Sequence, residues 1–396
     1  MAQSISQEAI GATGLPGATA ASRHAGATTS GAPTSGTFAV GDFIVDQSGA
    51  MYVCTVAGTP GTWGIVGTPP TAQIAGKNAI INGDFGVWQR GTTFNGITNG
   101  LFFADRWNIA NNNGGGANVN ITQQTFTPGT APVVGYESAY YLQYAQTVAG
   151  SGATYSQLVQ KIEDVRKFAN QTITVSFWAK SASGTINVNP VWGQYFGTGG
   201  TTGTFETGFS PGTISVNTTW TRYAAQITVP SIAGKTIGAN NNCAYFYFGL
   251  PLNSTFTLSV WGVQIEAGST ATQFTTASGS IGGELALCQR YFQSTYPLGV
   301  APGSTSSNLW TMIEMSETNR VLLPYEFPVQ MRTSPTMTAY SPQTGTVNKW
   351  YNRSTASDVT VSSFAAGPAQ VFYNTLSAGQ TAGNQMLVNF TASAEL

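Results

Sequence analysis

Apolar and polar side chains alternate along most of residues 78–280. In the segment QTITVSFWAKS, Ile173 and Phe177 fall on the apolar side, and Trp178 falls on the other side with threonine and serine. The segment TWTRYAAQITVP repeats this pattern. A period of two residues is typical of a strand with one buried face. Several such strands at regular spacing, separated by turn residues, predict an antiparallel β-sandwich.

Two shorter β blocks flank the sandwich. Residues 36–70 contain FIVDQSGAMYVCTV, which predicts a hairpin in a small N-terminal β module, with Cys54 as a small buried residue of its second strand. Residues 284–396 hold strand-like segments with proline-rich joints and predict a C-terminal β domain. Residues 1–35 are expected to be an attachment arm. Its three Gly-x-x triplets fit a collagen-like segment, but the period soon breaks, which favours a flexible arm.

One segment inside the sandwich block has a helical period. In YSQLVQKIEDVRKFAN, Leu158, Ile162 and Val165 recur at helical spacing, and Glu163 can reach a basic side chain one turn on. The same residues also fit a strand that runs into one helical turn. The sequence leaves both interpretations open.

A short helix is expected where the sandwich meets the C-terminal domain. In ELALCQRYFQ, one stripe of a helix holds Leu285, Cys288 and either Tyr291 or Phe292, at i, i+3 and i+6 or i+7. A helix of about two turns is marginal by itself and needs an apolar partner surface. We therefore expect Cys288 to pack at the joint, and the stripe to be the seam of a homotrimer if three chains associate.

The chain carries little charge. Only 8% of the residues are charged, against about a quarter in ordinary soluble domains, and the formal net charge is −1. Such a chain lacks the positive surface that binds a phosphate backbone, so nucleic acid is not an expected partner. The sequence has no apolar run of about 18 residues and no basic segment followed by an apolar one near its start. We therefore expect neither membrane insertion nor a recognisable export signal.

The cysteines give no sign of a disulfide or zinc framework. Cys54, Cys243 and Cys288 are far apart and odd in number, and no pair has the spacing of zinc ligands. We expect the chain to fold in a reducing compartment.

Several motifs occur in a fixed order over roughly residues 78–340. They are NAIINGDFGVWQRGT, ADRWN, QKIEDVRKFANQTITVSFWAKS, TWTRYAAQITVPSIAGKTI, LSVWGVQIEAGSTATQF, ELALCQRYFQ and FPVQMRTSPTMTAYS. Together they resemble a family of bacteriophage tail-fibre and receptor-binding proteins, whose central domain is similar to the jelly-roll carbohydrate-binding modules found beside glycanases. The resemblance implies a virion structural protein, usually a homotrimer, that touches the host surface.

No catalytic site is predicted. A nucleophilic Cys288 would need a base, and the single histidine, His24, lies in the expected arm, which argues against a Cys-His pair and a Ser-His-Asp triad. Glycoside hydrolysis needs two carboxyl groups about 5–10 Å apart, and no acidic residues stand in a pattern that marks such a pair. The adjacent Glu163 and Asp164 have basic neighbours and predict ion pairs instead.

One metal site is suggested by the resemblance. Jelly-roll carbohydrate-binding modules often hold a structural calcium near the first strand, and Asp84 in NGDFGVW is the candidate ligand. An aspartate in a glycine-flanked turn needs no metal, however, so calcium stays an alternative. No other cofactor is expected.

The aromatic side chains support the binding prediction. Sugars stack their C–H faces on flat rings, and neutral amides hydrogen-bond their hydroxyls. Strand alternation places Trp178 away from the core, although a neighbouring subunit would cover it equally well, and Trp192 would equally fit the core. Trp88 and Trp107 are expected to be structural. The candidate sugar-binding residues are Trp178, Trp192, Tyr195, Phe196 and, at a candidate fibre tip, Trp350 and Tyr351.

The expected fold class is all-β, with an antiparallel jelly roll at residues 78–280, a β module before it, a β domain after it and a short helix at the joint. The expected function is a phage tail-fibre subunit that binds host-surface glycans without cleaving them. It would be made in the host cytoplasm and sit in the virion, at the tail, attached to other virion proteins through its N-terminal arm. A purely structural capsid fibre or decoration protein and a glycan-cleaving tail spike are the alternatives.

Overall fold

The all-β fold class is confirmed by the computed structural model. The chain divides into two compact units, Met1–Ala72 and Gln73–Leu396. Among the described residues, strands dominate and α1 (Ile281–Gln289) is the single helix. None of the described part is a helix with the length and apolar character needed to cross a membrane. The structure describes residues 23–47, 49–67, 76–97, 99–112, 115–133, 137–203, 208–239, 241–305 and 310–396.

Unit 1 contains one small sheet with the order β1-β2-β3-β4. Its second and third strands form the predicted hairpin. Cys54 is fully buried in the third strand, as predicted. The strands are β1 (His24–Gly26), β2 (Phe43–Val45), β3 (Met51–Val56) and β4 (Thr62–Gly67).

The predicted boundary between the arm and this module is wrong. β1 pairs in parallel with β2, and the ring of His24 lies 5.2 Å from that of Phe43, so residues 23–35 belong to the module. The reason is that β2 supplies hydrogen-bond partners to the backbone of this segment, which the sequence pattern did not reveal. Residues 1–22 of the predicted arm and residues 68–75, which include the last three residues of the predicted module, lie outside the described residues.

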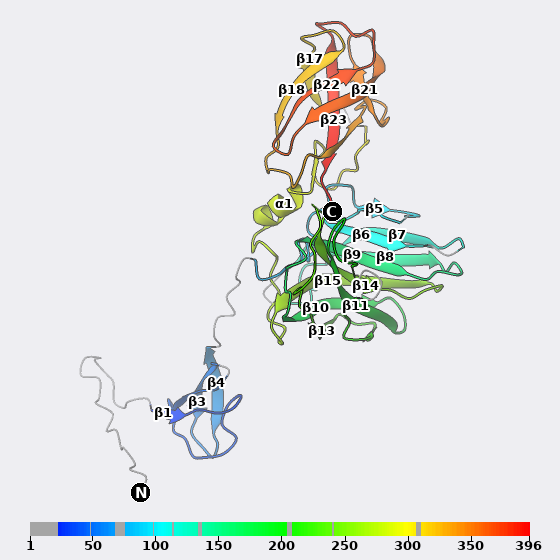
Figure 1. Cartoon of the computed structure of the whole chain (residues 1–396). Helices are drawn as coiled ribbons and strands as arrows, with labels where there is room; N and C mark the ends of the chain where they lie inside the picture. Colours follow the sequence, from blue (N-terminus) through cyan, green and yellow to red (C-terminus); the bar gives the residue numbers. More distant parts are fainter. Residues whose placement is uncertain are drawn as a thin grey trace, which may run out of the picture. The chain divides into compact units, whose positions relative to one another are not determined.

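Unit 2 begins with the predicted sandwich (Figure 1). Its strand pairings are antiparallel, with the orders β13-β10-β15-β8-β7-β5 and β12-β11-β14-β9-β6, and the jelly-roll prediction is confirmed. The first sheet consists of β5 (Thr93–Phe94), β7 (Asn118–Thr125), β8 (Tyr140–Val148), β10 (Thr172–Ser181), β13 (Thr221–Thr228) and β15 (Phe256–Ala267). The second sheet consists of β6 (Trp107–Asn111), β9 (Ser156–Glu163), β11 (Ile186–Tyr195), β12 (Ile214–Val216) and β14 (Cys243–Gly249).

The core between the two sheets follows the alternation seen in the sequence. Ile173 and Phe177 of β10 point into it, and so does Ile227 of β13. Trp88 and Trp107 are buried in the same core, as expected for structural residues. Each large apolar side chain removed from water here contributes roughly 1.5–3 kcal/mol to folding.

The segment with two open interpretations is a strand followed by a turn. β9 pairs with β6 on one side and with β14 on the other, so its backbone groups are satisfied by neighbouring strands. Asp164, directly after β9, has φ +69° and begins the turn. Tertiary pairing therefore outweighs the helical spacing of the apolar residues.

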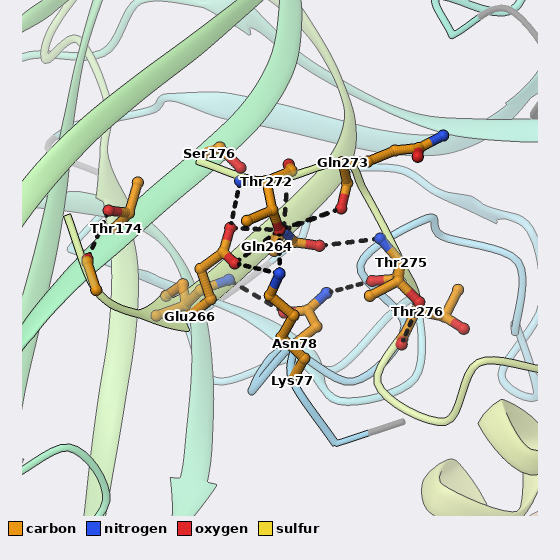
Figure 2. Close-up of polar contacts among 12 residues, drawn as sticks. Lys77, Asn78, Thr174, Ser176, Gln264, Glu266, Thr272, Gln273, Thr275 and Thr276 are labelled. Atoms are coloured by element: carbon orange, nitrogen blue, oxygen red, sulfur yellow. Dashed lines mark hydrogen bonds and ion pairs between the residues drawn. The ribbon is translucent and has the colours of Figure 1, made fainter. Parts of the chain in front are cut away.

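A buried polar network holds the end of β15 against the start of unit 2 (Figure 2). Glu266 accepts hydrogen bonds from the backbone and hydroxyl of Thr272 at 2.9 and 2.7 Å and from Gln264 at 2.7 Å. Lys77 lies 3.0 Å from the same carboxylate, and Asn78 donates to the carbonyl of Thr275 at 3.0 Å. Burial favours the neutral acid, but these donors outweigh it and lower the pKa of Glu266. The charges of Lys77 and Glu266 compensate each other, so we assign the network a structural role.

The C-terminal β domain is built around one long strand. β23 pairs with β16, β17, β19 and β20, which ties most of the domain to a single element. The strands are β16 (Phe292–Ser294), β17 (Thr311–Glu314), β18 (Arg320–Glu326), β19 (Thr336–Tyr340), β20 (Lys349–Asn352), β21 (Ser357–Ala366), β22 (Gln370–Leu376) and β23 (Gln385–Ser393).

The joint between sandwich and C-terminal domain is where the predicted helix lies. α1 begins after Ser280, whose hydroxyl accepts a hydrogen bond from the backbone of Gly283. Glu284 of α1 is buried and accepts hydrogen bonds from Asn82 of the sandwich and from Ser278. The helix is thus fixed to the sandwich by a buried carboxylate.

The predicted trimer seam is wrong for three of its four residues. Cys288, Tyr291 and Phe292 are 1%, 4% and 6% exposed within a single chain, and only Leu285 is half-buried. They cannot face a threefold axis because the joint of the same chain already covers them. Cys288 packs at the joint, as predicted.

Two arginines of the sandwich reach across this joint. The guanidinium of Arg106 lies 3.4 Å above the ring of Tyr291, and that of Arg90 lies 3.6 Å above the ring of Phe292. Both arginines also pair with the carboxylate of Glu395, next to the last residue of the chain. The rings seen as a stripe in the sequence are therefore cation-π partners inside the chain.

Asp105 makes the joint sensitive to pH. Burial raises the pKa of its carboxyl to about 6, although the charge of Arg90 and hydrogen bonds from Gln89 oppose the shift. The unfolded chain binds this proton only below pH of about 4, so the folded state gains stability from protonation of Asp105 as the pH falls from about 7 to about 4. Relative to Asp105→Asn, we expect the native chain to gain stability over this range, at up to about 1.4 kcal/mol per pH unit.

Urea unfolding of both proteins at a series of pH values checks this expectation. A stability difference between them that stays constant from pH 7 to pH 4 would show that Asp105 does not take up a proton in this range.

Candidate functional site

The outer face of the five-stranded sheet carries a set of polar and aromatic side chains. Along β14, Phe246 and Phe248 point into the core, and Tyr245 and Tyr247 point to the opposite face. The two tyrosine rings are parallel, 7° apart in orientation with centroids 6.1 Å apart. Strand alternation therefore places the phenylalanines of β14 in the core and its tyrosines on the outer face.

Two glycines shape this outer face. Gly249 of β14 lies between Gln157 of β9 and Asn189 of β11 in one row across three strands. A Cβ atom at Gly249 would meet its neighbours only at ordinary contact distance, 3.5 Å from Asn189, so the glycine leaves open floor between two amides. Gly193 of β11 lies beneath the ring of Tyr245, where a Cβ atom would come within 2.0 Å of the ring. The missing side chain of Gly249 leaves this face open, and the missing side chain of Gly193 leaves room for the ring of Tyr245.

A groove of about 890 Å³ runs over this open floor. Its rim includes Tyr155 and Leu252, which are 38% and 40% exposed. None of the described residues that line it is charged. The lining residues are Thr154, Tyr155, Ser156, Gln157, Asn187, Val188, Asn189, Thr213, Tyr247, Gly249, Leu250, Pro251 and Leu252.

The groove offers hydrogen-bonding groups that the chain itself leaves available. The side-chain oxygens of Asn187 and Asn189 accept from serine hydroxyls, at 2.9 Å for Asn187, while neither amide nitrogen donates to another described residue. Within the same described part of the chain, the side chains of Gln157, Tyr155 and Tyr247 make no hydrogen bond. Burial raises the pKa of Tyr247, which keeps its hydroxyl neutral. The site can therefore donate to and accept from neutral hydroxyl groups.

Most of the predicted sugar-binding rings are buried. Trp192 and Trp350 are 0% exposed, Phe196 is 2% and Trp178 is 8%. The prediction is wrong for these four, because a ring without an open face cannot stack on a sugar. Trp192 lies in the sandwich core, and Trp350 lies in the core of the C-terminal domain with its Nε1 donating to Asn389 at 3.0 Å.

Trp178 does leave the sandwich core, as the alternation predicted, but a second cluster covers it. It packs with Phe126, Trp261 and Phe274 on the other side of the six-stranded sheet. The guanidinium of Arg222 lies 4.6 Å from the centre of its ring. The cover comes from this chain and not from a neighbouring subunit.

The two remaining candidate rings are half-buried and lie in different domains. Tyr195 ends β11 and packs against the cluster that contains Tyr245 and Tyr247, on the same face as the groove. Tyr351 lies in β20 of the C-terminal domain, paired with Leu387. Sugar contact by either ring stays a prediction.

The sequence contained the signal for the groove. The segment CAYFYFG alternates tyrosine with phenylalanine, and INVNPVW alternates asparagine with valine. Because core positions select the apolar member of each pair, the same period-two argument places Tyr245, Tyr247, Asn187 and Asn189 on one outer face. What the sequence could not show is that β9, β14 and β11 are neighbours, which brings Gln157 to the same row.

Among the described residues of unit 2, the thiols and carboxylates offer no reactive pair at the groove. Burial raises the pKa of Cys288 well above its usual value and that of Cys243 to about 11, so neither thiol is poised as a thiolate. The predicted pairing with basic neighbours is confirmed for Asp164, which lies 3.1 Å from Arg166. Glu163 instead pairs with the distant Arg290, at 3.0 Å.

Asp84, the candidate calcium ligand, lies in a turn. Its Oδ1 accepts a hydrogen bond from the backbone of Gly86 at 3.3 Å. Within the described ranges, no three His, Cys, Asp or Glu side chains gather as a metal site. Calcium binding by Asp84 stays a prediction.

Comparison with known proteins adds weak structural similarities. No protein-family model matches the chain. No curated protein matches it. Among solved structures, it is similar to a CBM4 structure (16% identity, TM-score 0.30, covering 47% of this chain and 98% of the other). It is similar to the enzymatically active domain of bacteriophage CBA120 tailspike protein 4 (16%, 0.29, covering 48% and 22%) and to the family 11 carbohydrate-binding module of Clostridium thermocellum (9%, 0.28, covering 47% and 100%). At these TM-scores the similarities carry no argument about function.

Proposed function

We propose that this chain binds uncharged glycans in the groove on the outer face of the five-stranded sheet. The observation that carries the proposal is the lining: a groove of about 890 Å³ with neutral amides, hydroxyls and the exposed ring of Tyr155, and without a charged side chain among its described residues. A saccharide offers many hydroxyls and apolar C–H faces; the amides and the tyrosine hydroxyls match the first, and the exposed ring of Tyr155 matches the second. Because none of the described lining residues compensates the charge of a carboxylate or an ammonium group, a neutral sugar suits the groove better than an acidic or basic one.

The proposed role is binding without cleavage. Glycoside hydrolysis uses two carboxyl groups on either side of the scissile bond, and no residue in the described part of the groove lining is Asp or Glu. A bound glycan would be held by contacts alone, with the amides of Asn187 and Asn189 aimed along one side of the groove.

We further propose that the chain is a receptor-binding subunit of a phage tail fibre. The ordered motifs over residues 78–340 support this role, and so does the low charge of the surface, which suits a long-lived assembly. In a homotrimer, three grooves would bind a host surface with an avidity far above that of one groove. The chain would then reside in the virion, attached to tail proteins through its N-terminal region.

A glycan array that includes neutral and acidic saccharides tests the binding proposal. We expect the native chain to bind neutral glycans. Tyr155→Ala removes an exposed ring from the rim and should weaken binding roughly tenfold. Gly249→Leu places a side chain on the open floor, where the backbone tolerates a Cβ atom, and should abolish binding with little effect on folding.

The matched control is Tyr140→Ala. Tyr140 is 36% exposed, against 38% for Tyr155, but it lies on β8 in the other sheet. We expect this variant to bind like the native chain. Binding that survives both groove substitutions, or that falls equally with Tyr140→Ala, would place the glycan elsewhere.

A further inference from the structure

A small pit adjoins the groove at the end of β6. Its volume is about 10 Å³, which accepts one water-sized group. Four residues line both the pit and the groove, so the two spaces are neighbours. They are Tyr155, Ser156, Pro251 and Leu252. A ligand that lies in the groove can therefore place a small group in the pit.

The pit is lined by Asn111, the last residue of β6. Trp107 and Ile109 of this strand point into the sandwich core, and alternation gives Asn111 the next core-facing position. Asn111 is 3% exposed, and neither the oxygen nor the nitrogen of its side-chain amide has a hydrogen-bond partner among the described residues. A buried amide without hydrogen bonds costs free energy, and native proteins leave few side chains in this state.

The two other buried polar residues that line the pit are already partnered. The Nε2 of Gln146 donates to the carbonyl oxygen of Ala149 at 2.8 Å. The hydroxyl of Ser156 is hydrogen-bonded to that of Tyr144 at 3.0 Å. Among the described lining residues, the amide of Asn111 is therefore the buried polar group that is available to a ligand.

We propose that the pit takes one hydroxyl group of a neutral glycan in the groove, hydrogen-bonded to both the oxygen and the nitrogen of the Asn111 amide. The inference rests on the proposed function and names the group that this end of the groove selects. A hydroxyl donates one hydrogen bond and accepts others, so a single one can satisfy both atoms of an amide. The pit has room for the oxygen of that hydroxyl but not for a methyl or acetyl group attached to it. The groove therefore prefers a glycan with a free hydroxyl at this point to its O-methylated or O-acetylated form.

Asn111→Leu tests the hydrogen bonds, because leucine has nearly the shape of asparagine without its polar atoms. The probe is the neutral oligosaccharide that gives the strongest signal with the native chain on the glycan array, titrated in a calorimeter. We expect the variant to bind it roughly tenfold more weakly than the native chain. Its urea midpoint should equal or exceed that of the native chain, since the substitution removes a buried amide without partners. A purely structural residue would not combine preserved stability with weakened binding.

The matched control is Asn374→Leu. Asn374 is 0% exposed, and its side-chain amide also has no hydrogen-bond partner among the described residues. It lies in β22 of the C-terminal domain, however, and not in the lining of the groove. We expect this variant to match Asn111→Leu in stability and the native chain in glycan affinity.

Singly O-methylated forms of the same oligosaccharide test the size of the pit without any substitution in the protein. We expect the native chain to bind one of these forms at least about tenfold more weakly than the parent sugar. Asn111→Ala enlarges the pit and should recover binding of that form.

The possible failures of the pit and of the groove differ. Equal affinity of the native chain and Asn111→Leu for the parent sugar, or O-methylated forms that all bind like the parent sugar, would overturn the role of the pit and leave the groove intact. A native chain that binds no glycan on the array would overturn the proposed function, and the role of the pit with it.

Discussion

Glu395→Ala is expected to destabilise unit 2 by about 3–5 kcal/mol, because it leaves two buried guanidinium groups without their shared carboxylate. The side chains of Arg106 and Arg90 are 1% and 11% exposed, and that of Glu395 is 7% exposed. Arg90 keeps a second partner in Asp105 at 3.2 Å, but Arg106 has no other carboxylate among its ion pairs. The main cost therefore falls on Arg106. Urea unfolding followed by tryptophan fluorescence measures it.

The control for this substitution is Glu317→Ala. Glu317 and Arg320 also form an ion pair, at 3.1 Å, but their side chains are 48% and 45% exposed. Water already solvates both charges, so removal of this carboxylate should change the stability by about 1 kcal/mol or less. Equal effects of the two substitutions would mean that the joint does not depend on its buried charges.

This joint also shows what the sequence could predict and what it could not. The stripe of Cys288, Tyr291 and Phe292 correctly indicated a short apolar surface at the end of the sandwich. Its partner was not predictable, because Arg90, Arg106 and Glu395 are separated from it by about a hundred residues or more and belong to no local pattern. A periodic apolar stripe shows that a surface is covered, but it does not show which residues cover it.

The same limit applies to the candidate site. Alternation correctly put Ile173 and Phe177 in the core and Trp178 on the opposite side. It could not show that Phe126 and Phe274, from segments far away in the sequence, lie over that side. The groove escaped prediction for a related reason: Asn187 and Asn189 look like ordinary polar strand residues until the neighbouring strand supplies Gly249 as an open floor.

Trp178→Ala should show whether the ring of Trp178 stabilises the fold or binds a glycan. Trp178 is 8% exposed and packs with Trp261 at a centroid distance of 5.2 Å, and a bulge at Gly262 makes room for it. A Cβ atom at Gly262 would come within 2.8 Å of the indole. Removal of so enclosed an indole leaves a cavity and should cost about 3–5 kcal/mol. Glycan binding by the folded fraction should stay unchanged, since the groove lies on the other sheet.

Tyr155→Ala is the natural counterpart, because it should show the opposite behaviour. Tyr155 is 38% exposed at the rim of the groove, so its loss leaves no internal cavity and should leave the urea midpoint near that of the native chain while it weakens binding. The two variants together distinguish the interior from the ligand surface, since each should affect one measurement and spare the other. If Trp178→Ala instead folds as stably as the native chain and loses glycan binding, the ring has an open face in solution and the binding surface lies on the six-stranded sheet.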